Sequence, residues 1–156
     1  KIKADQIGIR VFATDLQQEE LVPLEWKDEY SAGVEKVDEQ HKEIFGALNE
    51  LEAQLSGGNF DESLALATIQ HICEETVEHF AFEEECMQRH KCPAAKSNEA
   101  AHSAFLATID GFKSRIGVEG LSEQLVRELH NAAANWIILH ICHTDVHLRA
   151  CVRGRE

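Results

Sequence analysis

A histidine and a glutamate lie four residues apart at His79 and Glu83, inside the longest stretch of helical periodicity in the chain. Residues at this spacing lie about 40° apart around an α-helix and one turn apart along it, so both side chains can reach one point beside the helix. An imidazole and a carboxylate placed in this way can bind one metal ion. Exposed helices often carry such a pair by chance, so the pair predicts a metal site only where other helices bring further ligands.

Four further residues of suitable chemistry fall on other segments with helical periodicity. They are three histidines and one aspartate: His41, His102, His140 and Asp145. In an antiparallel bundle the start of the first helix faces the end of the second, the start of the third and the end of the fourth, and these residues occupy those places. Glu83 lies on the apolar stripe of its helix, where a carboxylate is rare unless it is paired or metal-bound. The sequence therefore predicts that the six side chains meet in the core.

Four amphipathic segments would position these ligands. Apolar residues at helical spacing predict helices from Asp38 to Ser56, from Asp61 or Glu62 to about His90, from Ser97 to about Gly117, and from about Ser122 to the C-terminus. Asp38 and Ser97 are the expected N-caps of the first and third helices. Because the connections are short, we expect an all-α fold, an antiparallel up-down four-helix bundle.

The N-terminal segment has no sustained helical period. We expect an extended N-terminal arm or linker over residues 1–23 and one bundle domain over residues 24–152. A chain of 156 residues is long enough for a single domain with its own core. It begins with Lys1 rather than methionine, as expected for a piece of a longer protein.

Composition limits the class of partner and the compartment. A formal net charge of −13 repels nucleic acid and anionic membranes, so neither is expected as a partner. No run approaches the roughly 18 apolar residues that span a bilayer. An odd number of cysteines without a CxxC pair or a secretory signal predicts reduced thiols in a cytoplasmic protein. The cysteines are Cys73, Cys86, Cys92, Cys142 and Cys151.

Several short segments around the candidate ligands form a combined motif. The motif consists of Leu24-Glu25-Trp26, Gly33-Val34, Val37 to Lys42, His79-Phe80 with Glu83-Glu84 and Met87, Pro93, His102 with Phe105-Leu106, and Trp136 with His140-Ile141 and Asp145. In residue type, order and spacing it resembles a bacterial hemerythrin domain of the HHE type, over about residues 24–150. The resemblance implies a four-helix bundle with two non-heme irons, bridged by two carboxylates and an oxo or hydroxo group, that binds or senses dioxygen.

The resemblance also implies a role for each ligand. His41 and His79 would bind one iron, His102 and His140 would bind the other, and the carboxylates of Glu83 and Asp145 would bridge the two. Imidazole and carboxylate groups suit iron, and no thiolate is needed.

One position departs from the family pattern. Members usually carry a histidine four residues before the one that matches His102, and Asn98 stands there in this chain. Asn98 could coordinate through its carbonyl oxygen, or the site could hold a single iron. An iron with open positions favours sensing or redox chemistry over oxygen storage.

The spacing between His140 and Asp145 does not suit a regular helix. Five residues place two side chains about 140° apart on an ideal α-helix, too far for both to face one point. We therefore predict a π-bulge between them. A regular helix would instead favour a stripe of His140, His143 and His147, and would make His143 a candidate for the missing ligand.

Histidines outside the six-residue set are expected on the surface, but some of them could share a level along the bundle. The candidates for a second metal or a heme are His71 with His130 at one level, and His90 with His147, near Cys92 and Cys151, at the other end.

The leading functional hypothesis is a non-heme di-iron domain that binds dioxygen or senses redox state. Such a domain would be the sensory module of a larger bacterial signalling protein, covalently attached to an output domain of the diguanylate cyclase or chemoreceptor type. The alternatives are a small di-iron or mono-iron oxidase or peroxidase, and an iron or oxygen storage protein. The sequence favours a sensor over an enzyme but is compatible with both. It is also compatible with a homodimer.

Overall fold

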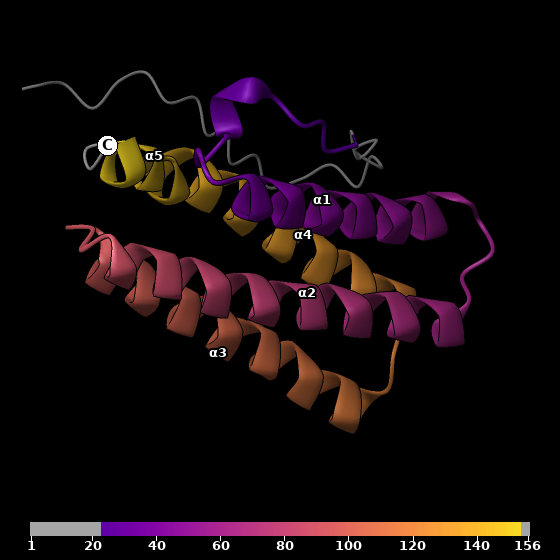
Figure 1. Ribbon diagram of the computed structural model, residues 1–156. Helices are drawn as coiled ribbons and strands as arrows, with labels where there is room; N and C mark the ends of the chain where they lie inside the picture. The colour runs from indigo at the N-terminus through magenta and orange to yellow at the C-terminus, as the bar shows by residue number, and fades with distance from the viewer. Residues whose placement is uncertain (1–22, 154–156) are drawn as a thin grey trace, which may run out of the picture.

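Four long helices pack side by side, and successive helices run in opposite directions across the view in Figure 1. A computed structural model describes residues 23–153, so the arm expected over residues 1–23 lies outside the described part except for Pro23. The long helices are α1 (Glu35–Ser56), α2 (Glu62–Arg89), α3 (Ala95–Glu119) and α4 (Glu123–His140). The 3-10 helix η1 (Asp28–Tyr30) precedes them, and the π-helix η2 (Ile141–Asp145) and α5 (Val146–Arg153) extend α4. The prediction of an all-α four-helix bundle is confirmed.

The second and fourth long helices begin where their sequences predict, at Glu62 and Glu123, and each is preceded by a side-chain cap. The Asp61 carboxylate accepts a hydrogen bond of 3.0 Å from the Leu64 backbone N–H, and Ser122 Oγ accepts one of 3.2 Å from Leu125. Each cap satisfies a backbone donor that would otherwise lack a partner in the first turn.

The other two helices begin earlier than predicted. α1 starts at Glu35, and Asp38 lies inside it, where its carboxylate accepts hydrogen bonds of 2.6 Å from the Ala32 N–H and from Ser31 Oγ. Asp38 therefore fastens the preceding segment to α1 instead of capping the helix. α3 starts at Ala95, two residues before the expected cap at Ser97.

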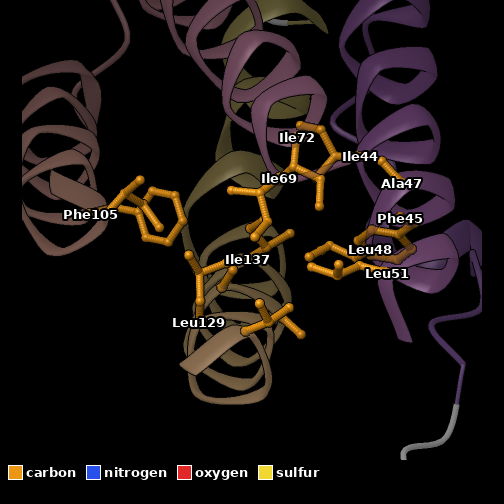
Figure 2. Packing of buried hydrophobic residues seen from close by; sticks show 14 of the residues in the cluster. Ile44, Phe45, Ala47, Leu48, Leu51, Ile69, Ile72, Phe105, Leu129 and Ile137 are labelled. Atoms are coloured by element: carbon orange, nitrogen blue, oxygen red, sulfur yellow. The ribbon is translucent and has the colours of Figure 1, made fainter. Parts of the chain in front are cut away.

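Apolar side chains from all four long helices fill the centre of the bundle, as Figure 2 shows. The labelled members are Ile44, Phe45, Ala47, Leu48, Leu51, Ile69, Ile72, Phe105, Leu129 and Ile137. Burial of each large side chain stabilises the fold by about 1.5–3 kcal/mol relative to leaving it in water.

No helix within residues 23–153 is long and apolar enough to cross a membrane.

A disulfide joins Cys92, in the turn after α2, to Cys151 in α5. The prediction that all the thiols are reduced is therefore wrong, although the expected approach of these two cysteines is confirmed. An odd count does not exclude a single bridge, because the remaining cysteines can stay free, as Cys73, Cys86 and Cys142 do. The bridge links segments 59 residues apart and packs in a small cluster with Met87 and Leu148.

Candidate metal centre

Four buried histidines, one from each long helix, direct their Nε2 atoms to one region of the core. The Nε2 atoms of His41 and His79 lie 3.1 Å apart, and those of His102 and His140 lie 3.0 Å apart. Lone pairs that face each other at this distance repel unless a proton or a cation lies between them. Each pair of imidazoles is therefore arranged to share a cation.

Two carboxylates lie between the histidine pairs, and both are fully buried. Asp145 Oδ2 is 3.2 Å from His41 Nε2, and Asp145 Oδ1 is 3.0 Å from His140 Nε2. Glu83 Oε2 is 3.4 Å from His102 Nε2. Within the described part of the chain, Glu83 Oε1 and both oxygens of Asp145 nevertheless have no hydrogen-bond partner. Burial of an unpaired carboxylate strongly destabilises a folded protein, so a cation beside these oxygens would be stabilising.

The six side chains form two groups that share both carboxylates. In each group the four potential ligand atoms lie within 4.8 Å of one another. The first group is His41, His79, Glu83 and Asp145, and the second is Glu83, His102, His140 and Asp145. Imidazole nitrogen and carboxylate oxygen suit iron, and no cysteine belongs to either group. The residues therefore fit a pair of metal ions bridged by carboxylates.

The π-helix explains how Asp145 reaches the site. η2 takes more residues per turn than an α-helix, which returns Asp145 to the face that carries His140. The predicted π-bulge is confirmed. His143 and His147 are both exposed, so the alternative stripe that would have placed His143 among the ligands is wrong.

Two further side chains orient the histidines, and this role could not be assigned from the sequence. His102 Nδ1 is 2.8 Å from Glu84 Oε1, and His79 Nδ1 is 3.4 Å from Gln40 Oε1. A hydrogen on Nδ1 leaves the Nε2 lone pair free for a metal, and such partners hold the ring in place. The only signal in the sequence is adjacency, since Gln40 precedes His41 and Glu84 follows Glu83.

Aromatic rings cover the faces of two imidazoles, His102 and His140, and leave little free space. Phe80 stacks on His102 with a centroid distance of 3.7 Å, and Trp136 stacks on His140 at 4.3 Å. A cavity of about 10 Å³ touches the site, and its lining includes His41, His140 and Trp136. This volume is close to the minimum for one water molecule, so only a very small ligand fits without movement of side chains.

Burial and contacts within the site shift the pKa values of its groups in both directions. Burial, reinforced by His41, holds the pKa of His79 well below its ordinary value. Burial also acts to raise the pKa of Asp145, but contacts with His140 and His41 outweigh it and hold that pKa well below the usual range. A neutral imidazole and an ionised carboxylate are the states that metal binding requires. Burial raises the pKa of Glu83, so metal binding at this carboxylate must displace a proton more readily held than usual.

Asn98 lies one turn before His102 on α3 and is fully buried. Its Nδ2 donates a hydrogen bond of 2.9 Å to Glu83 Oε2, while its Oδ1 has no hydrogen-bond partner among residues 23–153. Asn98 therefore lies in direct contact with a candidate ligand.

The surplus histidines do not form a comparable group. His71 is exposed with its Nδ1 3.8 Å from Glu75, whereas His130 is buried with its Nδ1 3.4 Å from Asn131 Oδ1. Within residues 23–153, the only groups of three or more histidine, cysteine or acidic side chains at metal-binding separation are the two described above. A metal or heme at His71 with His130, or at His90 with His147, stays a prediction.

Comparison with known proteins agrees with this geometry. Residues 32–150 match the family described as the hemerythrin HHE cation binding domain. A bacteriohemerythrin from Stenotrophomonas maltophilia (strain R551-3) is 29% identical over 122 residues, 78% of this chain and 76% of that protein. A bacteriohemerythrin from Pseudomonas aeruginosa (strain UCBPP-PA14) is 28% identical over 123 residues, with 78% and 76% covered. A myohemerythrin from Theromyzon tessulatum is 26% identical over 123 residues, with 79% and 88% covered. The chain therefore belongs to the hemerythrin family of non-heme di-iron, oxygen-binding domains.

Proposed function

We propose that two irons bind at the two ligand groups, one at His41 and His79 and the other at His102 and His140. Glu83 and Asp145 would bridge them. The observation that carries this proposal is that both groups contain the same two buried carboxylates, whose unpartnered oxygens need cations. When bound, the irons supply reversible redox chemistry and the capacity to bind dioxygen.

The protein contributes a dry and rigid setting for that chemistry. Gln40 and Glu84 hold the rings of His79 and His102 with their Nε2 atoms toward the centre. Phe80 and Trp136 cover the imidazoles and limit the access of water. This setting favours a small uncharged ligand over a bulky one.

We further propose that the domain is the sensory module of a larger cytoplasmic signalling protein, with an attached output domain of the diguanylate cyclase or chemoreceptor type. The supporting feature is the position of Asp145, which ends η2 and directly precedes α5. A displacement of this carboxylate when the irons change state would move the start of α5, and α5 would pass the movement to its neighbours.

The decisive experiment measures iron per chain and the absorption spectrum of the anaerobically reduced protein before and after air. We expect two irons per chain and new near-ultraviolet bands after air. The variant His102→Ala should lose iron, whereas His71→Ala, which changes an exposed histidine on α2, should retain it. One iron or fewer in the wild-type protein would contradict the two-iron proposal.

An oxidase or peroxidase is the second candidate, because each ligand group offers four protein donors and leaves positions open to a substrate. Steady turnover of peroxide by the isolated domain would favour this candidate, whereas a sensor should change state once and stop. A storage protein would instead show loosely held, exchangeable iron.

A further inference from the structure

Asn98 is a buried amide in contact with a carboxylate of the candidate metal centre, and no described residue donates a hydrogen bond to its carbonyl oxygen. The side chain is fully buried, and its Nδ2 donates to Glu83 Oε2 at 2.9 Å. Its Oδ1 is also buried but accepts no hydrogen bond from the described residues. An unpartnered carbonyl oxygen in a protein interior is unfavourable, so a partner for Oδ1 is expected.

The bond to Glu83 also determines where Oδ1 lies. Nδ2 and Oδ1 belong to one planar amide, so the bond from Nδ2 to Glu83 keeps Oδ1 in the neighbourhood of that carboxylate. The partial negative charge of the amide oxygen is stabilised there if a cation lies close to both groups. A neutral amide oxygen can bind a hard cation. The N–H group of the same amide can meanwhile donate to a carboxylate ligand and so hold both groups in place.

Asn98 also lies on the correct face of α3. It precedes His102 by four residues, so the two side chains are neighbours one turn apart. His102 belongs to the second ligand group, and the Glu83 oxygen that Asn98 contacts is the one nearest to His102, at 3.4 Å. The amide is therefore associated with the second group.

We propose that Asn98 Oδ1 is a fifth protein ligand for the metal at His102 and His140, held in place by the bond from Nδ2 to Glu83. This inference rests on the two-metal site proposed above. The two metal positions then differ: the one at His41 and His79 has four protein donors, and the one at His102 and His140 has five. The cavity beside the site is lined by both histidines of the four-donor position, His41 and His79, and by His140 of the five-donor position.

Cobalt(II) titration of the metal-free protein tests this role without relying on activity. Cobalt(II) absorbs visible light more strongly as its coordination number falls, so the absorption per bound ion reports a lost ligand. Asn98→Leu removes both the oxygen and the N–H group. Asn98→Asp keeps an oxygen donor but removes the N–H group. The matched control is Gln54→Leu, because Gln54 Nε2 donates to Thr68 Oγ1 at 2.9 Å and its Oε1 is likewise buried and unpartnered.

We expect wild-type protein, Asn98→Asp and Gln54→Leu to bind two cobalt ions with similar absorption per ion. Asn98→Leu should bind the second ion about tenfold more weakly and absorb more strongly. The proposal is overturned if Asn98→Leu matches the wild type. The proposal is also overturned if Asn98→Asp changes the cobalt affinity and absorption as much as Asn98→Leu does. That result would mean that Asn98 acts only through its N–H bond to Glu83. Failure of the wild type to bind two ions would overturn the two-metal site itself, and this inference with it.

Discussion

The imidazole of His102 shows how one side chain is prepared for metal binding. Its Nε2 faces the centre, its Nδ1 is 2.8 Å from Glu84 Oε1, and its ring lies flat against Phe80. Burial acts to lower the pKa of His102, but the contacts of its ring with Glu83 and Glu84 outweigh burial and raise that pKa. Glu84 therefore fixes the ring and makes its free nitrogen a better electron donor.

Removal of Glu84 should weaken metal binding without unfolding the protein. We expect Glu84→Ala to lower the metal affinity about 10–100-fold, as is typical for the loss of a partner behind a ligating histidine. Competition with a coloured chelator measures the affinity. Glu85→Ala is the control, because Glu85 is exposed and pairs only with Arg89. Equal affinities in the two variants would rule out an orienting role for Glu84.

At the scale of elements, η2 and α5 connect the metal centre to one end of the bundle. Asp145 is the last residue of η2, and α5 begins at the next residue. The bridge from Cys151 to Cys92 ties α5 to the turn between α2 and α3, and Leu148 of α5 is fully buried in the same cluster. α5 therefore follows directly after a proposed metal ligand and is fastened near its end by a covalent bond.

Loss of the disulfide should destabilise the protein through this element. We expect Cys151→Ser to lower the free energy of unfolding by about 2–4 kcal/mol, because the oxidised unfolded chain loses a constraint across 59 residues. Urea unfolding with and without a dithiol reductant measures the effect. The reductant should destabilise the wild type and the free-thiol control Cys73→Ser equally, and leave Cys151→Ser unchanged. A reductant effect in Cys151→Ser would contradict this assignment.

At the scale of the whole molecule, the bundle places a cluster of uncompensated polar groups in its interior. Four imidazoles and two carboxylates are buried together in the core, and three of the carboxylate oxygens lack hydrogen bonds from the described residues. The folded state without metal therefore carries a penalty that two cations remove. Metal binding to the folded chain alone adds stability that grows with metal concentration.

Removal of the metal should therefore lower the melting temperature. At about a thousandfold excess of metal over Kd, one bound ion adds about 4 kcal/mol, which corresponds to a shift of roughly 10 °C for a chain of this length. Calorimetry of the loaded and chelator-treated protein measures the difference. We expect His140→Ala to abolish most of it and His71→Ala to leave it unchanged. A loaded protein that melts within 2 °C of the metal-free form would count against the buried two-metal centre.

The local pattern of the sequence was sufficient to predict the helices, their buried faces and the convergence of the six candidate ligands. These features follow from the 3.6-residue period of an α-helix and from the antiparallel order of short-linked helices. The same geometry predicted the π-bulge, because five residues on a regular helix could not place His140 and Asp145 on one face.

Contacts between residues far apart in the chain depended on the tertiary structure. The bond from Asn98 to Glu83, the partner of His102 at Glu84 and the disulfide each join different elements, and no periodicity within one helix encodes them. The early start of α1 has the same cause, since Asp38 is used to bind the segment before the helix. Spacing along the chain determined which side chains share a face, and only the packing of one helix against another decided which atoms meet.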